Sequence, residues 1–225
     1  LYLVKAGVKL HMSDGSALVC EKARERLEQE LGPNHGVDVR CVLWNDIAKV
    51  YGKNAFDVII WRGNSLPYVG GDWNAPSSSN ASRAPMGYHR LHASAQGIFD
   101  GLAPGGKVYV DCVPGTAAKG AVVKKEGIIP DGSNAKIQLD WEFKVDEEAR
   151  ARQWSSTATI HEDGKETRSM NTNVTALLVR EQEVRSVLSY VGFGLVEATV
   201  CEGEDVYQPF IASKPAAEVG YYDRQ

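Results

Sequence analysis

Two short polar segments of the sequence carry side chains that suit the binding of a small molecule. They are Asp14-Gly15-Ser16 and Arg62-Gly63-Asn64, and each follows a predicted strand. The Asp14 carboxylate can accept hydrogen bonds from two neighbouring hydroxyl groups of a ligand. The Arg62 guanidinium fits a carboxylate through two hydrogen bonds, and the Asn64 amide offers both a donor and an acceptor. These groups predict recognition and orientation of a ligand.

Aromatic side chains lie close to both segments in the sequence. Trp44 and Asn45 follow the apolar stretch Val37–Leu43, and they offer a ring face and a polar amide. Tyr68 lies shortly after Arg62 and offers a hydroxyl group, or a ring wall for a methylammonium group. We therefore add these three residues to the candidate ligand contacts.

Each candidate also has a purely structural interpretation, which the sequence leaves open. An Asp before Gly commonly forms a turn, as Asp14 would. Trp44 can instead pack in the core, and Arg62 can pair with a buried acidic residue.

The histidines and cysteines do not form a catalytic or metal-binding pattern. His89 and His92 are three residues apart, but no carboxylate follows at a matching spacing, so we expect surface or capping roles for them. The cysteines lie far apart and include no C-x-x-C pair, which favours buried thiols over zinc ligands or disulfides. They are Cys20, Cys41, Cys112 and Cys201.

Composition narrows the class of protein. The 225 residues are 43% hydrophobic and 24% charged, which is typical of a globular chain. The net charge of −4 argues against a dedicated nucleic-acid binder. No apolar run reaches the roughly 18 residues that cross a bilayer. We therefore expect neither nucleic-acid nor membrane partners, and the buried thiols favour a cytoplasmic protein. A homo-oligomer is compatible with the sequence.

Apolar periodicity in the first half of the chain predicts alternating strands and helices. Such alternation is typical of an α/β, Rossmann-like sheet with helices on both faces. The run Phe56–Trp61 is almost wholly apolar, as expected of a central parallel strand covered on both faces. The predicted strands are Val8–Met12, Val37–Leu43, Phe56–Trp61 and Lys107–Cys112, and the predicted helices are Ala17–Leu31 and Tyr88–Leu102.

The pattern changes after about residue 134. We expect a long loop over residues 70–87, and then three antiparallel strands at Ile137–Val145, Arg152–His161 and Thr167–Thr175. A helix at Arg180–Val191 and a strand pair at Phe193–Cys201 and Val206–Ser213 complete the chain. The predicted division is an α/β core over 1–134, an antiparallel β insertion over 135–176, and a C-terminal helix and hairpin over 177–225.

Several segments, in this order, resemble class I S-adenosylmethionine-dependent methyltransferases. The resemblance covers roughly residues 1–115 and 178–213. It rests on a strand ending in an acidic motif, a central strand, the turn before the next strand, and the turn before a C-terminal hairpin. These segments are Asp14-Gly15-Ser16, Phe56–Ile60, Leu102–Val108 and Val191-Gly192-Phe193. The resemblance implies that S-adenosylmethionine is the cofactor, and that its glycine-rich loop and first strand lie before Leu1.

A narrower resemblance involves the segment Arg62–Tyr68, which reads Arg-Gly-Asn-Ser-Leu-Pro-Tyr. It is similar to the glycine, sarcosine and dimethylglycine N-methyltransferases, which make sarcosine or betaine, and the arginine is more similar to the sarcosine/dimethylglycine branch. The insertion resembles the substrate-covering subdomain of that family.

The two resemblances imply roles for individual residues. The cofactor would be bound by Asp14, Gly15, Ser16, Trp44, Asn45, Trp61 and Gly63. The amino substrate would be held by Arg62, Asn64 and Tyr68, with Tyr68 also the candidate catalytic group near the reacting nitrogen. Methyl transfer requires chiefly alignment and a deprotonated amine, so it needs no catalytic triad or metal.

The expected function is therefore methyl transfer from S-adenosylmethionine to the nitrogen of a small amino acid such as glycine, sarcosine or dimethylglycine. Three other functions remain open on the sequence. One is a methyltransferase with another small-molecule acceptor, and another is a non-catalytic module of the same fold. The third is a nicotinamide-dependent oxidoreductase, which the acidic strand end also fits although the sequence shows no G-x-G-x-x-G.

Overall fold

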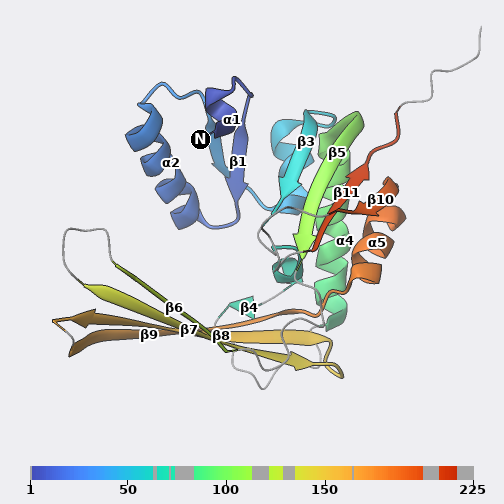
Figure 1. The fold of residues 1–225 in the computed structure, drawn as a ribbon. Helices are drawn as coiled ribbons and strands as arrows, with labels where there is room; N and C mark the ends of the chain where they lie inside the picture. The colour runs from blue at the N-terminus through green and yellow to red at the C-terminus, as the bar shows by residue number, and fades with distance from the viewer. Residues whose placement is uncertain are drawn as a thin grey trace, which may run out of the picture.

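A computed structural model of the chain describes residues 2–62, 65–70, 72–73, 84–112, 122–128, 135–163, 165–199 and 208–216. Within these ranges the strands form three sheets (Figure 1). Two smaller sheets lie side by side with helices around them, and a long antiparallel sheet lies below them in the view of Figure 1. The expected α/β architecture is confirmed, although its sheet is divided.

The first sheet is the parallel pair of β1 (His11–Asp14) and β2 (Asp38–Cys41). Helix α2 (Ala17–Leu31) packs on it and has the bounds that the sequence predicts. The Ser16 hydroxyl caps the start of α2 by accepting a hydrogen bond from Val19 N, and Gly32 ends it with a φ of 84°. A small separate core forms between these elements from Cys20, Leu27, Val37 and Val39.

The second sheet has the strand order β10-β11-β5-β3. β3 (Phe56–Trp61) and β5 (Leu102–Cys112) are parallel, and β11 (Gln208–Ser213) runs antiparallel to β5 and pairs with β10 (Gly194–Ala198). The His11 ring of β1 contacts the Phe56 ring of β3 at 5.5 Å, which links this sheet to the first.

Helices α4 (Ala84–Gly101) and α5 (Glu181–Tyr190) lie on the same side of the second sheet (Figure 1). The main core forms between them and the sheet, where Trp61 and Val108 are completely buried. On the other side of β3, Val58 and Ile60 are 57% and 49% exposed. Coverage of β3 on both faces was therefore wrong for the described residues, because the helices that pack on this strand all lie on one side.

The remaining helical segments are short: α1 (Tyr2–Lys5), the 3-10 turns η1 (Trp44–Asp46) and η2 (Leu66–Gly70), and α3 (Ile47–Tyr51). None of the helices in the described ranges is both long and apolar enough to cross a membrane. Helix α4 starts at Ala84, earlier than the predicted Tyr88.

The third sheet has the order β4-β9-β8-β7-β6 and is antiparallel throughout. Its long strands β7 (Lys136–Asp146), β8 (Ala151–Glu162) and β9 (Lys165–Leu177) contain the three strands predicted from the sequence. Two strands were not predicted, β4 (Asp72–Trp73) and β6 (Val122–Ile128). β4 is too short to give a pattern, and the Lys-Lys-Glu-Gly of β6 lacks the residues that favour strands. The sheet thus takes in strands before the predicted insertion at residue 135.

Strand β5 also begins earlier than predicted, at Leu102. The sequence Ala-Pro-Gly-Gly at 103–106 predicts a sharp break, but Gly105 N donates to Lys214 O at 3.0 Å and Lys214 N donates to Gly106 O at 2.8 Å. A register shift between Phe56 and Val58 accommodates the irregular segment. Tertiary pairing therefore keeps this segment extended.

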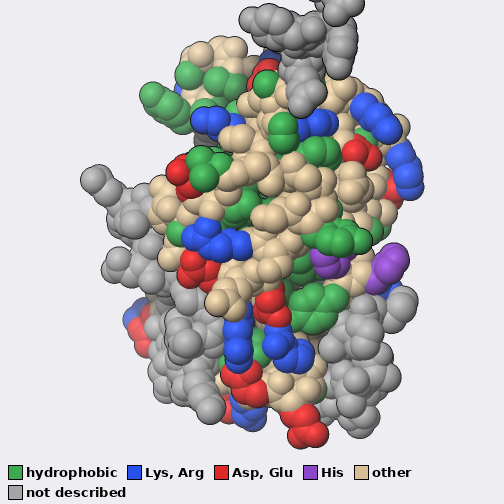
Figure 2. Space-filling model, turned by 90° about the vertical axis from the view of Figure 1, so that its right-hand side faces the viewer, with side chains coloured by type: hydrophobic (Ala, Val, Ile, Leu, Met, Phe, Trp, Pro, Cys, Tyr) green, Lys and Arg blue, Asp and Glu red, His purple; other side chains and the backbone are tan. Residues whose placement is uncertain are grey.

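Acidic and basic side chains are interspersed over the face of the molecule seen in Figure 2. The exposed ion pairs Arg26–Glu30 and Lys22–Glu25 on α2 follow the same mixed pattern.

Candidate functional site

A cavity of about 1100 Å³ opens where β1 and β2 end, and α4 forms part of its wall. Ends of parallel strands in α/β folds commonly form ligand sites because the loops that follow them converge there. Its described lining residues are Asp14, Gly15, Ser16, Val19, Val42, Leu43, Trp44, Asn45, Ser65, Tyr68, Val69, His89, Arg90, Ala93 and Ser94. The structure thus brings together six of the sequence-predicted site residues: Asp14, Gly15, Ser16, Trp44, Asn45 and Tyr68.

Asp14 is held in a defined position at the end of β1. Its Oδ1 accepts a hydrogen bond from Ser16 N at 2.7 Å, and its carbonyl oxygen accepts one from Val42 N at 3.0 Å. No described residue donates to its Oδ2. The turn-forming interpretation of Asp14 is therefore confirmed, and the same geometry leaves one carboxylate oxygen available to a ligand.

Gly15 lets the turn after β1 approach the end of β2. A Cβ atom at Gly15 would lie 2.9 Å from Leu43 Cδ2, closer than real carbon contacts allow. Both residues line the cavity. A side chain at this position would therefore reshape the cavity wall.

Trp44 and Asn45 belong to η1, which α4 contacts directly. A Cβ atom at Gly97 of α4 would lie 2.4 Å from Trp44 O and 2.7 Å from Asn45 Cα. Close backbone packing thus fixes η1 against the helix. The Trp44 ring also lies 5.4 Å from the Trp61 ring, measured between centroids.

Trp61 itself does not line the cavity. It is completely buried in the main core, and its ring packs against the Trp44 ring. The structure therefore places it as a packing residue, although the sequence predicts a direct cofactor contact.

Arg62 follows β3 and lies beside Asp111 on the neighbouring strand β5. Its Nε is 3.7 Å from Asp111 Oδ2, and Asp111 is completely buried. Arg62 is not among the described residues that line the cavity. This arrangement favours the structural interpretation of Arg62, pairing with a buried acid, over a substrate contact. The predicted site residues Gly63 and Asn64 lie outside the described residues.

The η2 turn supplies another wall of the cavity. Ser65 Oγ donates to Arg62 O at 2.8 Å, and Tyr68 N donates to Ser65 O at 3.0 Å. These bonds fold the segment after β3 so that Ser65, Tyr68 and Val69 line the cavity. Tyr68 is half-buried there.

Four lining residues on α4 were not predicted: His89, Arg90, Ala93 and Ser94. Their spacing places them on adjoining rows of one helix face. Sequence reasoning assigned His89 a surface role because it has no catalytic partner. The feature of the sequence that could have indicated this wall of the cavity is the Ala93-Ser94 pair, one turn further along the helix. Its small side chains leave space beside α4.

Cys112, at the end of β5, is not placed as a nucleophile. Burial raises the pKa of its thiol to about 12, and the Asp111 carboxylate contributes in the same direction. The protonated thiol is a poor nucleophile at neutral pH.

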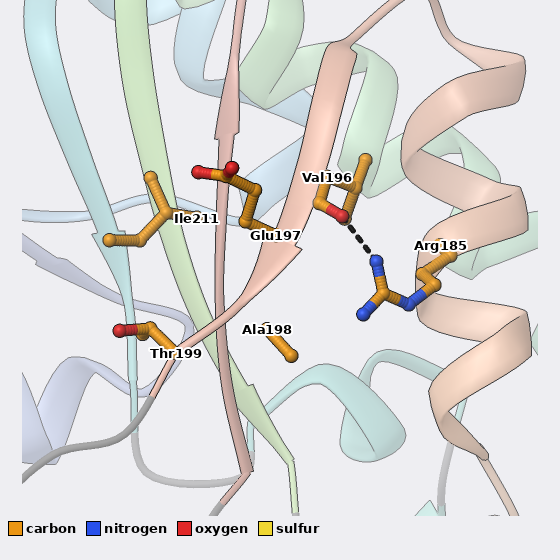
Figure 3. A pocket seen from close by; sticks show the side chains of 6 residues that line it. All are labelled: Arg185, Val196, Glu197, Ala198, Thr199 and Ile211. Carbon is orange, nitrogen blue, oxygen red and sulfur yellow. Dashed lines mark hydrogen bonds between the residues drawn. The ribbon is translucent and has the colours of Figure 1, made fainter.

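A second hollow of about 540 Å³ lies beside β10, β11 and α5 (Figure 3). Arg185 points across it and donates to Val196 O, as the dashed line shows. The same guanidinium also bonds Glu181 Oε1 at 2.9 Å. The Arg185 side chain thus links α5 to β10.

No protein-family model matches this sequence, and no curated protein sequence matches it significantly. Solved structures do match its fold. A methyltransferase from Clostridium acetobutylicum, described as S-adenosylmethionine-dependent, has a TM-score of 0.67 at 11% identity, over 95% of this chain and 78% of that one.

Two methyltransferases of sugar substrates are similarly close in fold. The S-adenosylmethionine-bound amino pentose methyltransferase CalS10 from Micromonospora echinaspora gives a TM-score of 0.66 at 14% identity, over 91% of this chain and 73% of that one. The sugar N-methyltransferase KedS8 from Streptoalloteichus gives 0.64 at 13% identity, over 91% and 70%. This chain therefore has the Rossmann-like fold of class I S-adenosylmethionine-dependent methyltransferases.

Proposed function

We propose that this protein is an S-adenosylmethionine-dependent methyltransferase that acts on the nitrogen of a small amine. The observation that carries the proposal is the cavity at the ends of β1 and β2, with the Asp14 carboxylate and η1 on its wall, in a chain with a methyltransferase fold. Its volume of about 1100 Å³ is slightly above the usual range for small-molecule sites.

The described residues fit the adenosine part of this cofactor. Asp14 Oδ2 has no donor within the described residues and suits a ribose hydroxyl. Trp44 and Asn45 offer a ring face and an amide to the base. The packing of Gly97 on η1 holds these two residues in place before any ligand binds.

When bound, S-adenosylmethionine supplies a methyl group that leaves its sulfur for the lone pair of the acceptor nitrogen. The chain's contribution is to orient both reactants and exclude water. Tyr68 is our candidate for the wall next to the reacting nitrogen, because it lines the cavity from η2. Its ring suits a methylated ammonium product.

Two observations support a small amine as the acceptor, although they favour different classes of amine. The segment Arg62–Tyr68 is similar to enzymes that methylate glycine and its derivatives, whereas two of the fold neighbours are described as acting on sugars. The placement of Arg62 beside Asp111 weakens the amino-acid interpretation, because that guanidinium already faces a carboxylate.

Calorimetric titration of the full chain with S-adenosylhomocysteine tests the cofactor assignment. We expect saturable one-to-one binding, with adenosine competing for the same site. Absence of binding at millimolar ligand would reject the proposed function.

A further inference from the structure

The charged lining of the cavity is unbalanced in a way that the adenosine part of the cofactor does not explain. Among the described lining residues, Asp14 is the carboxylate, and the basic side chains are Arg90 and His89 on α4. The adenosine part of the cofactor is neutral, so it does not call for a guanidinium group. Arg90 is therefore a feature of the site without an assigned ligand.

Arg90 makes no hydrogen bond or ion pair with any residue that the structure describes, and no ion pair links it to Asp14. Other arginines in the described ranges have hydrogen-bond partners within the protein. For example, Arg24 donates to Val39 O at 2.8 Å, and Arg26 donates to Glu30 at 3.0 Å. Arg90 is exposed and lines the cavity. An arginine in this position without a protein partner suits an anionic ligand group, because its planar fork binds carboxylate or phosphate.

The position of Arg90 along α4 separates it from the proposed adenosine site. Gly97 marks where the helix contacts η1. Arg90 lies seven residues nearer the start of the helix, or about 10 Å along its axis. Between them, Ala93 and Ser94 line the cavity with small side chains. Arg90 therefore belongs to a part of α4 nearer the start of the helix than the part that contacts Trp44 and Asn45.

We propose that Arg90 binds an acidic group of the methyl acceptor, so that the preferred acceptor is an amine that also carries a carboxylate or phosphate. His89 lines the cavity beside it and supplies a further hydrogen-bond donor. This inference rests on the proposed function. The carboxylate of the cofactor is the other source of the same chemistry, and the experiment separates the two.

The test compares wild-type protein with Arg90→Gln, which keeps hydrogen-bond donors but removes the charge. Arg26→Gln is the matched control, because Arg26 is exposed on α2 and is not a described lining residue of the cavity. Two pairs of acceptors differ in their acidic group: sarcosine against N-methylethanolamine, and glucosamine 6-phosphate against glucosamine. Steady-state methyl transfer is measured for all four, and S-adenosylhomocysteine binding by calorimetry.

In at least one pair, we expect the acidic member to have a kcat/KM at least tenfold above its neutral partner. Arg90→Gln should raise the KM of that acidic acceptor about tenfold or more. It should leave the neutral acceptor and the Kd for S-adenosylhomocysteine within twofold, and Arg26→Gln should change none of these values.

Equal use of acidic and neutral acceptors by the wild type would overturn the proposal and leave the proposed function intact. A loss of S-adenosylhomocysteine affinity in Arg90→Gln that matches the rise in KM would also overturn it, by assigning Arg90 to the cofactor. Wild-type protein that does not bind S-adenosylhomocysteine would overturn both the proposed function and this inference.

Discussion

The two carboxylate oxygens of Asp14 have different surroundings. Oδ1 accepts a hydrogen bond from Ser16 N at 2.7 Å, whereas no described residue donates to Oδ2. An Asp-Gly-Ser sequence at a strand end is compatible with both a turn and a ligand contact, and the methyltransferase resemblance favours the contact. Only the geometry shows that a single side chain can serve both, because the turn uses one oxygen.

Replacing Asp14 with Asn should separate these two roles. The Asn side-chain oxygen can still accept from Ser16 N, so stability should change by less than about 1 kcal/mol. Affinity for S-adenosylhomocysteine should fall roughly 10- to 100-fold, because a charge-assisted hydrogen bond contributes about 1.5–3 kcal/mol. Calorimetry measures the affinity, and urea denaturation measures the stability. Asp163→Asn, in the β8–β9 hairpin, is the control; an equal loss of affinity there would contradict the assignment.

The cysteines give a prediction that depends on protonation. Burial raises the pKa of Cys112 to about 12, whereas Cys41 is exposed. The thiolate is the reactive form, so at pH 8 iodoacetamide should modify Cys41 in the native protein and Cys112 only after denaturation. Peptide mass spectrometry locates the adducts. Rapid native modification of Cys112 would show that the end of β5 is open to solvent.

At the scale of elements, the close contact between α4 and η1 fixes one wall of the site. The sequence predicts a helix in this region, but it gives no sign that Gly97 is the contact point. A glycine inside a helix is usually only a mild cost. At position 97 a glycine is required by the contact with η1, because a Cβ atom would lie 2.4 Å from Trp44 O.

Gly97→Ala should therefore force α4 and η1 apart. We expect a loss of about 1–3 kcal/mol in the free energy of unfolding, as for other overpacked positions, together with weaker S-adenosylhomocysteine binding. Gly127→Ala on β6 is the matched control, since its nearest heavy atom would be 3.6 Å away. Denaturant titration checks both variants. A Gly97→Ala protein as stable as the wild type would contradict this packing.

At the scale of the whole molecule, the third sheet is joined to the core by a partly buried polar cluster. Tyr88 Oη of α4 lies 3.0 Å from both Leu178 O and Glu183 Oε1, and it accepts from Arg150 Nη2 at 2.9 Å. Arg150 precedes β8 and also pairs with Glu183 of α5. The cluster thus connects α4, α5 and the third sheet.

Tyr88→Phe should destabilise the protein by about 0.5–1.5 kcal/mol at pH 7, because its partly buried partners lose a hydrogen bond. Burial also raises the Tyr88 pKa above its ordinary value of 10.0. In the unfolded chain the phenol ionises first, so wild-type stability should fall as pH rises above 10, and Tyr88→Phe should lack part of that fall. Urea denaturation at pH 7 and 10.5 tests this, with the exposed Tyr190→Phe as control. Equal stability of wild type and Tyr88→Phe at pH 7 would contradict the role of the cluster.

Sequence reasoning predicted much of the fold, because periodicity reports local structure. The bounds of α2 and β3 follow from apolar spacing and end signals such as Ser16 and Gly32. The exposure of Val58 could not be predicted, because it depends on which elements pack against β3. Likewise, Asp14 and Trp44 were found from motifs, whereas Arg90 reaches the site only through the tertiary placement of α4.

The most direct test of the central claim is transfer of a labelled methyl group. The full chain is incubated with [methyl-13C] S-adenosylmethionine and a pool of glycine, sarcosine, dimethylglycine and amino sugars, and the products are followed by NMR. We expect a new 13C resonance of an N-methyl group on at least one amine, in an amount that grows with enzyme concentration. Label that remains on sulfur, in a protein shown to bind S-adenosylhomocysteine, would contradict methyl transfer to a small amine.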